Sequence, residues 1–289
     1  MGDREGRGGC AAWLDGPGCE RSRSAVGELC GHAGGWALRR RHREPTEKHG
    51  HGLFLTANQS AEAERLAQHV SALGLKRMVL VQAQSSSGRA AATALEEGLW
   101  VAGIQVADKV NLRPDGSDAD AAAQQVHKAN GQAVLLATSG RATAAMLLAL
   151  AGGHDVGMPL LQVYGMSSAA SQSDLLSLGT KARGFSITQV IPLPRDSSVQ
   201  VVAKFLTAMR SQPGTRTYTE LEGCIGPLVL AEVLRKKPGD LNRAGMLKAL
   251  RAVGRIDLGG FEVDLADKAK RGSRFTDIVY VGSDGRIAR

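Results

Sequence analysis

The chain has 289 residues, of which 43% are hydrophobic, 22% charged and 4% aromatic, and its formal net charge at pH 7 is +8. These values are typical of a globular protein of one or two domains, and the low aromatic content disfavours a site that stacks bases or sugars. Because Lys and Arg form no dense stripe on any predicted helix, we interpret the charge as a scattered basic surface and expect no nucleic-acid partner. No stretch approaches the roughly 20 apolar residues of a membrane span.

Residues 1–50 differ in composition from the rest of the chain. Gly, Arg, Cys and Pro are frequent there, and the hydrophobic residues follow neither the period of a strand nor that of a helix. We expect this segment to be disordered or never selected to fold. It holds three of the four cysteines without C-x-x-C spacing, so we expect no disulfide framework and no metal site, and Cys224 is interpreted as a small buried hydrophobe. The segment also lacks the apolar centre of a secretory signal.

Ordered structure is predicted from about Phe54 onward. The first helix has an apolar face that includes Leu66, Val70 and Leu73, and Ser60 can cap its start. In chain order, we predict a helix at 61–73, a strand at 77–83, a helix at 88–100, a strand at 103–110, a helix at 118–130, a strand at 132–138, a helix at 142–150, a strand at 160–164, a further helix, and a strand at 184–190. Short apolar strands that alternate with helices indicate an α/β fold with a parallel sheet covered on both faces.

The pattern changes after the strand at 184–190. Three consecutive helices are predicted at 197–211, 218–236 and 242–253. Thr217 and Glu220 have the spacing of a capping box, and Pro227 is expected to kink the second helix. The chain then ends in two predicted strands around an Asp284-Gly285 turn.

Small polar turns follow three of the predicted strands. They are Gln84 to Gly88, Ser139 to Arg141, and Gly165 to Ser168. Small molecules bind outside the carboxyl ends of parallel strands, and a helix that begins there offers free N–H groups to a carboxylate. The alternative is that these serines are only helix caps, which is the more common role of such turns.

Several short motifs are spaced in a recognisable order. They are Phe54-Leu-Thr-Ala-Asn, Arg77-Met-Val-Leu-Val, Ala182 to Pro194, Leu221-Glu-Gly-Cys-Ile, Asp257-Leu-Gly-Gly-Phe, and Ser273 to Arg286. Over roughly residues 50–289, this order resembles the type I periplasmic solute-binding proteins of ABC importers, in the leucine/isoleucine/valine-binding branch.

The resemblance implies a type I periplasmic-binding-protein fold, with two α/β lobes that close on a small solute. Residues 51–192 and 274–289 would form a largely complete, Rossmann-like second (C-terminal) lobe, and residues 193–273 the helical remainder of a truncated first (N-terminal) lobe. The apolar faces of two of its helices would then be exposed or pack against one another, and we expect poor solubility. These faces carry Val201, Val202, Phe205, Leu206, Ile225, Leu228, Val229 and Val233.

The same resemblance points to Ser87, Ser139, Gly140 and Ser167 as ligand-binding residues. The family commonly offers an aromatic side chain at the position of Ser87 and an acid for the ligand's ammonium group at the position of Ser167. Serine can donate and accept hydrogen bonds but brings no charge. A zwitterionic amino acid is therefore less firmly implied than the fold itself.

We thus expect a non-catalytic protein, without a cofactor, that binds an amino acid or related compound and delivers it to ABC permease subunits. The resemblance implies a periplasmic location, in contact with the membrane only through the permease. Without an export signal, the chain as written could instead stay in the cytoplasm. A ligand-sensing regulatory module and an α/β enzyme are the alternatives.

An enzyme is disfavoured because the sequence contains no G-x-S-x-G, P-loop or H-E-x-x-H motif, and no G-x-G-x-x-G motif after a strand. His127 and His154 are interpreted as solvated residues on or after helices. We therefore expect no catalytic residue.

Overall fold

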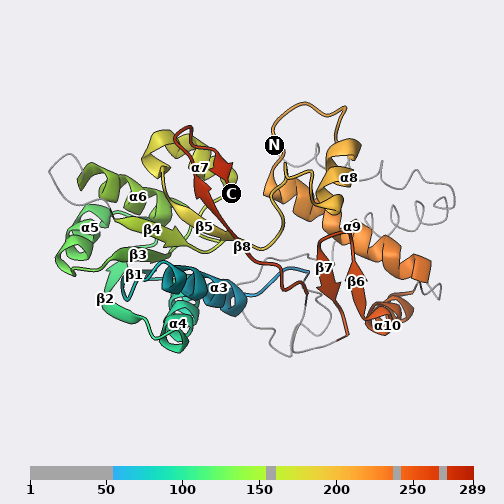
Figure 1. Ribbon diagram of the computed structural model, residues 1–289, viewed down its shortest axis with the longest axis horizontal. Coiled ribbons are helices and arrows are strands. Elements are labelled where there is room, and N and C mark those ends of the chain that lie inside the picture. The colour runs from blue at the N-terminus through green and yellow to red at the C-terminus, as the bar shows by residue number, and fades with distance from the viewer. Residues whose placement is uncertain (1–54, 154–160, 237–241, 267–271) are drawn as a thin grey trace. The chain divides into compact units, whose positions relative to one another are not determined.

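The computed structural model describes residues 55–153, 161–236, 242–266 and 272–289 (Figure 1). Within these residues the chain divides into two compact units. The sheet unit comprises Asn58–Val190 and Thr276–Arg289, and the helical unit comprises residues 55–57 and Ile191–Phe275. The expectations for residues 1–50 and for His154 lie outside the described residues.

The sheet unit alternates strands and helices, as predicted, with ends that differ by a few residues. Its elements are α3 (Gln59–Ala72), β1 (Arg77–Ala83), α4 (Ser86–Val101), β2 (Gln105–Leu112), α5 (Ala119–Lys128), β3 (Ala133–Ala137), α6 (Arg141–Gly153), β4 (Gln162–Gly165), α7 (Gln172–Leu178), the 3-10 helix η4 (Gly179–Ala182), β5 (Ser186–Gln189), β8 (Asp277–Val281) and β9 (Ile287–Ala288).

The strands form one sheet in the order β2-β1-β3-β4-β5-β8-β9. The first five are parallel, and β8 and β9 are antiparallel to their neighbours. The helices α3 and α4 cover one face of this sheet, and α5 and α6 cover the other (Figure 1). The order reverses between β1 and β3, because β2 lies on one side of β1 while β3, β4 and β5 follow on the other.

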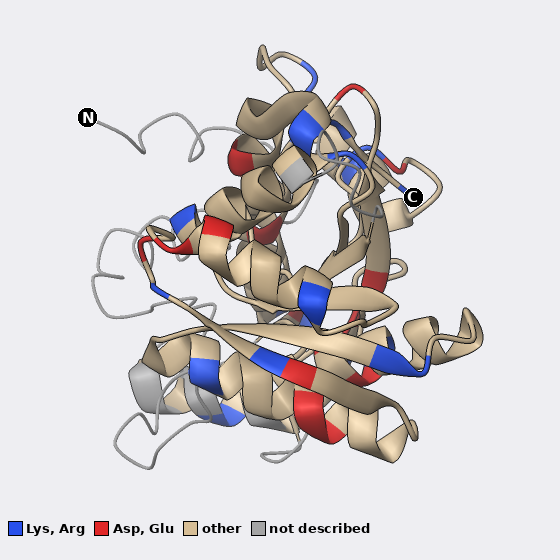
Figure 2. Cartoon of the chain, turned by 90° about the vertical axis from the view of Figure 1, so that its left-hand side faces the viewer, with Lys and Arg blue, Asp and Glu red and all other residues tan. Residues whose placement is uncertain are grey.

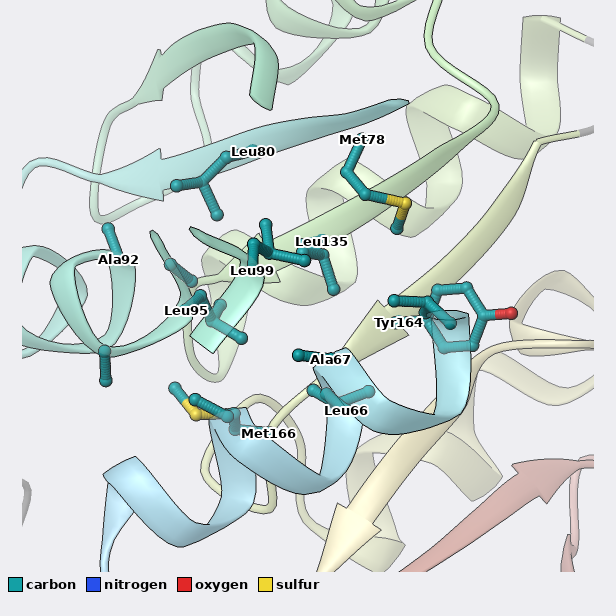
Figure 3. Close-up of a cluster of buried hydrophobic side chains, with 14 of the residues drawn as sticks. Leu66, Ala67, Met78, Leu80, Ala92, Leu95, Leu99, Leu135, Tyr164 and Met166 are labelled. Carbon is teal, nitrogen blue, oxygen red and sulfur yellow. The ribbon is translucent and has the colours of Figure 1, made fainter. Parts of the chain in front are cut away.

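The core on the α3 and α4 side is made of alternate strand residues. Successive side chains of a strand point to opposite faces, so Met78 and Leu80 of β1 meet this side while Val79 and Val81 meet the other. All four are fully buried, which is why β1 reads as a continuous apolar run. Figure 3 shows Met78, Leu80 and Leu135 of the sheet packed with Leu66, Leu95 and Leu99 of the two helices. Each such side chain contributes roughly 1.5–3 kcal/mol through burial.

The start of α3 differs from the prediction. The capping residue is Asn58, whose Oδ1 accepts a hydrogen bond from the Ala61 N–H at 2.9 Å, and Ser60 lies inside the helix. At the other end, Leu73 was expected on the apolar face but is 57% exposed. It is the residue that caps the carboxyl end of α3, beyond the last turn that packs on the core.

The helical unit contains the three predicted helices and a hairpin that was not predicted. Its elements are α8 (Gln200–Ala208), α9 (Tyr218–Lys236), α10 (Arg243–Val253), β6 (Arg255–Asp257) and β7 (Glu262–Asp264). The capping box of α9 is confirmed, because the Thr217 N–H donates to Glu220 Oε2 at 2.8 Å and the Glu220 N–H donates to Thr217 Oγ1 at 3.2 Å. The hairpin strands have three residues each, too few to show an alternating pattern.

The apolar faces of α8 and α9 are not left open. Six of the eight residues expected on an exposed or self-packed surface are buried, and Leu206 and Leu228 are partly buried. Of the two alternatives, burial contradicts the exposed patch and is compatible with packing of the two helices against one another. Poor solubility stays a prediction. Cys224 is buried as expected but is disulfide-bonded, which corrects its interpretation as a simple buried hydrophobe.

Charged residues of both signs are interspersed over the elements visible in Figure 2. A surface ion pair between Lys109 Nζ and Glu96 Oε1, at 2.9 Å, is one example on β2 and α4. Within the described ranges, every helix is too short or too polar to cross a bilayer.

Candidate functional site

The reversal of strand order singles out one place on the sheet unit. From β1 the chain leads into α4 on one face of the sheet, and from the adjacent β3 it leads into α6 on the opposite face (Figure 1). In doubly wound sheets, ligands bind outside the carboxyl ends of the strands at such a point. Ser87 follows β1, and Ser139 and Gly140 follow β3, so these residues flank the expected position.

Ser87 lies within the first turn of α4 and does not cap the helix. The cap is Ser85, whose Oγ accepts from the Gly88 N–H at 3.0 Å, and the Ser87 Oγ lies 3.2 Å from the Ser85 Oγ. Gly88 packs directly on the end of β1, since a Cβ built there would lie 2.3 Å from the Ala83 carbonyl oxygen. The close approach holds the first turn of α4, and Ser87 with it, against the end of β1.

Ser139 and Gly140 form the turn after β3. Ser139 is exposed, and Gly140 has a φ of 54°, in the left-handed region that favours glycine. The Gly140 N–H donates to the Ala169 carbonyl at 2.9 Å. This hydrogen bond joins the turn after β3 to the turn after β4.

Ser167 lies in the turn after β4 and is buried, with 6% of its surface exposed. Its backbone N–H lies 2.8 Å from Glu62 Oε2 and 3.0 Å from Thr188 Oγ1. The Thr188 hydroxyl in turn donates to the same Glu62 oxygen at 2.5 Å. The Ser167 N–H therefore donates to acceptors on α3 and β5.

The structure brings the four predicted residues to one edge of the sheet, because β1, β3 and β4 are adjacent and parallel. Their role in binding stays a prediction. Sequence reasoning missed Glu62 and Thr188, which are both buried. One signal was present: Glu62, Leu66 and Val70 recur every four residues, which places the carboxylate on the buried stripe of α3.

The described residues hold no group of three or more His, Cys, Asp or Glu side chains that could bind a metal ion. His127 is partly buried and not solvated as predicted, and among the described residues neither of its ring nitrogens has a hydrogen-bond partner. Burial lowers its pKa below 6.5. His127 lies in the last turn of α5, which leads to the amino end of β3 and so to the opposite edge from the candidate site.

Two features define the type I periplasmic-binding-protein fold. The first is a parallel sheet of strand order 2-1-3-4-5 that is extended by the antiparallel strands β8 and β9. The second is a further compact unit that three chain connections link to the sheet unit. The sequence agrees, since residues 35–286 match the family described as periplasmic binding protein. The chain belongs to this family, and the resemblance found in its motifs is confirmed.

Solved structures with a similar fold include other binding proteins. An extracellular ligand-binding receptor from Verminephrobacter eiseniae is 25% identical with a TM-score of 0.76, and the match covers 93% of this chain and 77% of that one. A substrate-binding periplasmic protein from Ralstonia solanacearum is 22% identical with a TM-score of 0.67, with coverages of 81% and 67%.

An ABC transporter substrate-binding protein from Desulfitobacterium hafniense, in complex with Leu, is 20% identical with a TM-score of 0.67, with coverages of 83% and 68%. Among curated proteins, no sequence match was found.

Proposed function

We propose that the protein binds a small solute, an amino acid or a related compound, and delivers it to the permease subunits of an ABC importer. The observation that carries the proposal is the set of polar turns at the carboxyl edge of the sheet, on both sides of the reversal in strand order. Membership of the periplasmic binding protein family supports it, as does the similar fold of a substrate-binding protein described in complex with Leu.

In this proposal, Ser87, Ser139, Gly140 and Ser167 contact the solute. The amino ends of α4 and α6 suit a carboxylate, because the amino end of a helix carries partial positive charge. The sheet unit would act as the second lobe and the helical unit as part of the first. Capture would follow from closure of the lobes about the connections at Ala57/Asn58, Val190/Ile191 and Phe275/Thr276.

The proposal includes a periplasmic location, which family membership supports. The protein would meet the membrane through the permease, and the chemistry would be binding and release with no covalent step.

A thermal-shift screen of the purified chain against the twenty amino acids tests this function, with a panel of sugars as the control. A ligand at 100 times its dissociation constant stabilises the folded state by about 2.7 kcal/mol. At about 2–4 °C per kcal/mol, the melting temperature should rise by roughly 5–10 °C. Calorimetric titration should then give one site per chain. If no amino acid raises the melting temperature and none gives binding heat, the proposed solute class is wrong.

A further inference from the structure

The buried carboxylate of Glu62 joins three parts of the sheet unit. Glu62 lies in the first turn of α3 and is 4% exposed, and it contacts partners 105 and 126 positions away in the sequence. A single carboxylate oxygen, Oε2, accepts both the Ser167 N–H and the Thr188 hydroxyl. Thr188 Oγ1 also accepts the Ser167 N–H. The three residues therefore form a closed triangle of hydrogen bonds, which we call the Glu62 triangle.

The Glu62 triangle lies next to the places where the chain leaves the sheet unit. Residue 62 is four positions after Asn58, where the chain enters this unit, and residue 188 is two positions before Val190, where the chain leaves it. Thr188 is also paired with Ile278 of β8, close to the third connection. The triangle thus joins two of the chain connections to the turn that carries Ser167.

We propose that Glu62 is a positioning residue for the solute site, holding the Ser167 turn at the geometry that binding requires. The inference rests on the proposed function of that edge. A turn fixed before binding loses less conformational entropy when the ligand arrives, so a fixed turn binds more tightly than a mobile one. Both hydrogen bonds are buried, and breaking either of them would leave a polar group without a partner away from water, which gives this triangle the strength to hold the turn.

Four substitutions separate positioning from other roles. Glu62→Ala removes the acceptor, whereas Glu62→Gln keeps an amide oxygen that can accept both hydrogen bonds without the charge. Thr188→Val keeps the volume of the side chain and removes the hydroxyl, and Thr188→Ser keeps the hydroxyl. Val126→Ala is the matched control, since Val126 is fully buried on α5, on the opposite face of the sheet.

The test measures hydrogen exchange at the Ser167 amide and the affinity for L-leucine, both well below the melting temperature. We expect Glu62→Ala and Thr188→Val to speed exchange by about tenfold, because each substitution removes one of the two acceptors of the buried Ser167 N–H. The affinity for L-leucine should fall by a similar factor. Glu62→Gln and Thr188→Ser should retain both properties, and Val126→Ala should lower the melting temperature without changing either.

Three results would overturn the proposal. The first is unchanged exchange at Ser167 in both Glu62→Ala and Thr188→Val. The second is an equal loss of affinity in Val126→Ala, which would make the effect one of general stability. The third is a loss of affinity in Glu62→Gln with normal protection of Ser167, which would show that the charge acts on the ligand directly. If the wild type does not bind L-leucine, the affinities are measured with the amino acid that raises the melting temperature most. If no amino acid binds, the proposed function fails, and exchange at Ser167 still decides whether Glu62 fixes the turn.

Discussion

Replacement of Gly88 by Ala tests the contact that places the candidate site at the end of β1. A Cβ at Gly88 would lie 2.3 Å from the Ala83 carbonyl oxygen and 2.9 Å from the Ala83 Cβ. Both distances are well inside van der Waals contact, and the carbonyl belongs to the last residue of β1, a strand that pairs with β2 on one side and β3 on the other. The new methyl group can therefore be accommodated only if the first turn of α4 moves away from β1.

The magnitude follows from two opposing effects. Forcing an extra methyl group into a packed contact costs about 1–3 kcal/mol. Replacing Gly by Ala in a helix also restricts the unfolded chain, which stabilises the folded state by about 0.4–1 kcal/mol. We expect a net loss of about 1–2 kcal/mol in the free energy of unfolding. Ser87 precedes Gly88 and moves with the turn, so the affinity for a bound amino acid should fall as well.

Gly152→Ala is the matched control for this substitution. Gly152 lies in α6 of the same unit, and a Cβ there would meet no described atom within 4 Å. This variant should gain about 0.4–1 kcal/mol from the restricted unfolded chain. Urea denaturation of both variants gives the two free energies. If Gly88→Ala is as stable as Gly152→Ala, the packing of α4 on β1 does not determine the position of Ser87.

Three further predictions concern the cap of α3, the partly buried His127 and the core. Asn58→Ala should lower the free energy of unfolding by about 1 kcal/mol in urea denaturation, because it removes the cap of α3. Ser60→Ala should change the same free energy by less than about 0.5 kcal/mol. A larger loss in Ser60→Ala than in Asn58→Ala would show that Ser60 is the cap. Burial lowers the pKa of His127 below 6.5, so as the pH falls this residue takes up a proton in the unfolded chain before it does so in the folded protein. The free energy of unfolding should therefore be constant with respect to His127 above about pH 6.5 and decrease below it. The pKa of His69 is also lowered, first by burial and then by Arg65, so His69 contributes to the same decline. His127→Gln removes only one of the two causes, and its melting temperature should therefore fall less steeply than that of the wild type between pH 8 and pH 5. An unchanged slope would exclude His127 as a cause. Leu135→Ala should lower the free energy of unfolding by about 2–5 kcal/mol in urea denaturation, because Leu135 is fully buried in the centre of the sheet. A loss below about 1 kcal/mol would contradict the packing of that core.

Local signals in the sequence predicted most of the sheet unit. The strand β1 is a run of buried apolar residues between a glycine and a serine cluster, so its position followed from hydrophobicity and turn residues alone. The capping box of Thr217 and Glu220 is likewise local, because its partners are three residues apart. Where several local signals competed, the prediction was less accurate, as with Ser60 and Asn58 at the start of α3.

The two unpredicted features have different causes. The hairpin β6–β7 is too short to show a pattern of its own, and the turn between its strands depends on two glycines at positive φ whose N–H groups donate to Asp257. Glu62 appeared in the sequence as one acidic residue near the start of a helix. Its burial follows from the meeting of α3, β4 and β5, which no local window contains.

The sequence by itself determined the α/β class, the order of the elements and the three polar turns, because periodicity and turn chemistry are properties of neighbouring residues. Only the tertiary structure decided the strand order, the face of the sheet that each helix covers, and the hydrogen bonds from the Ser167 N–H to Glu62 and Thr188. These depend on which strands pair, and pairing is set by the packing of side chains far apart in the chain.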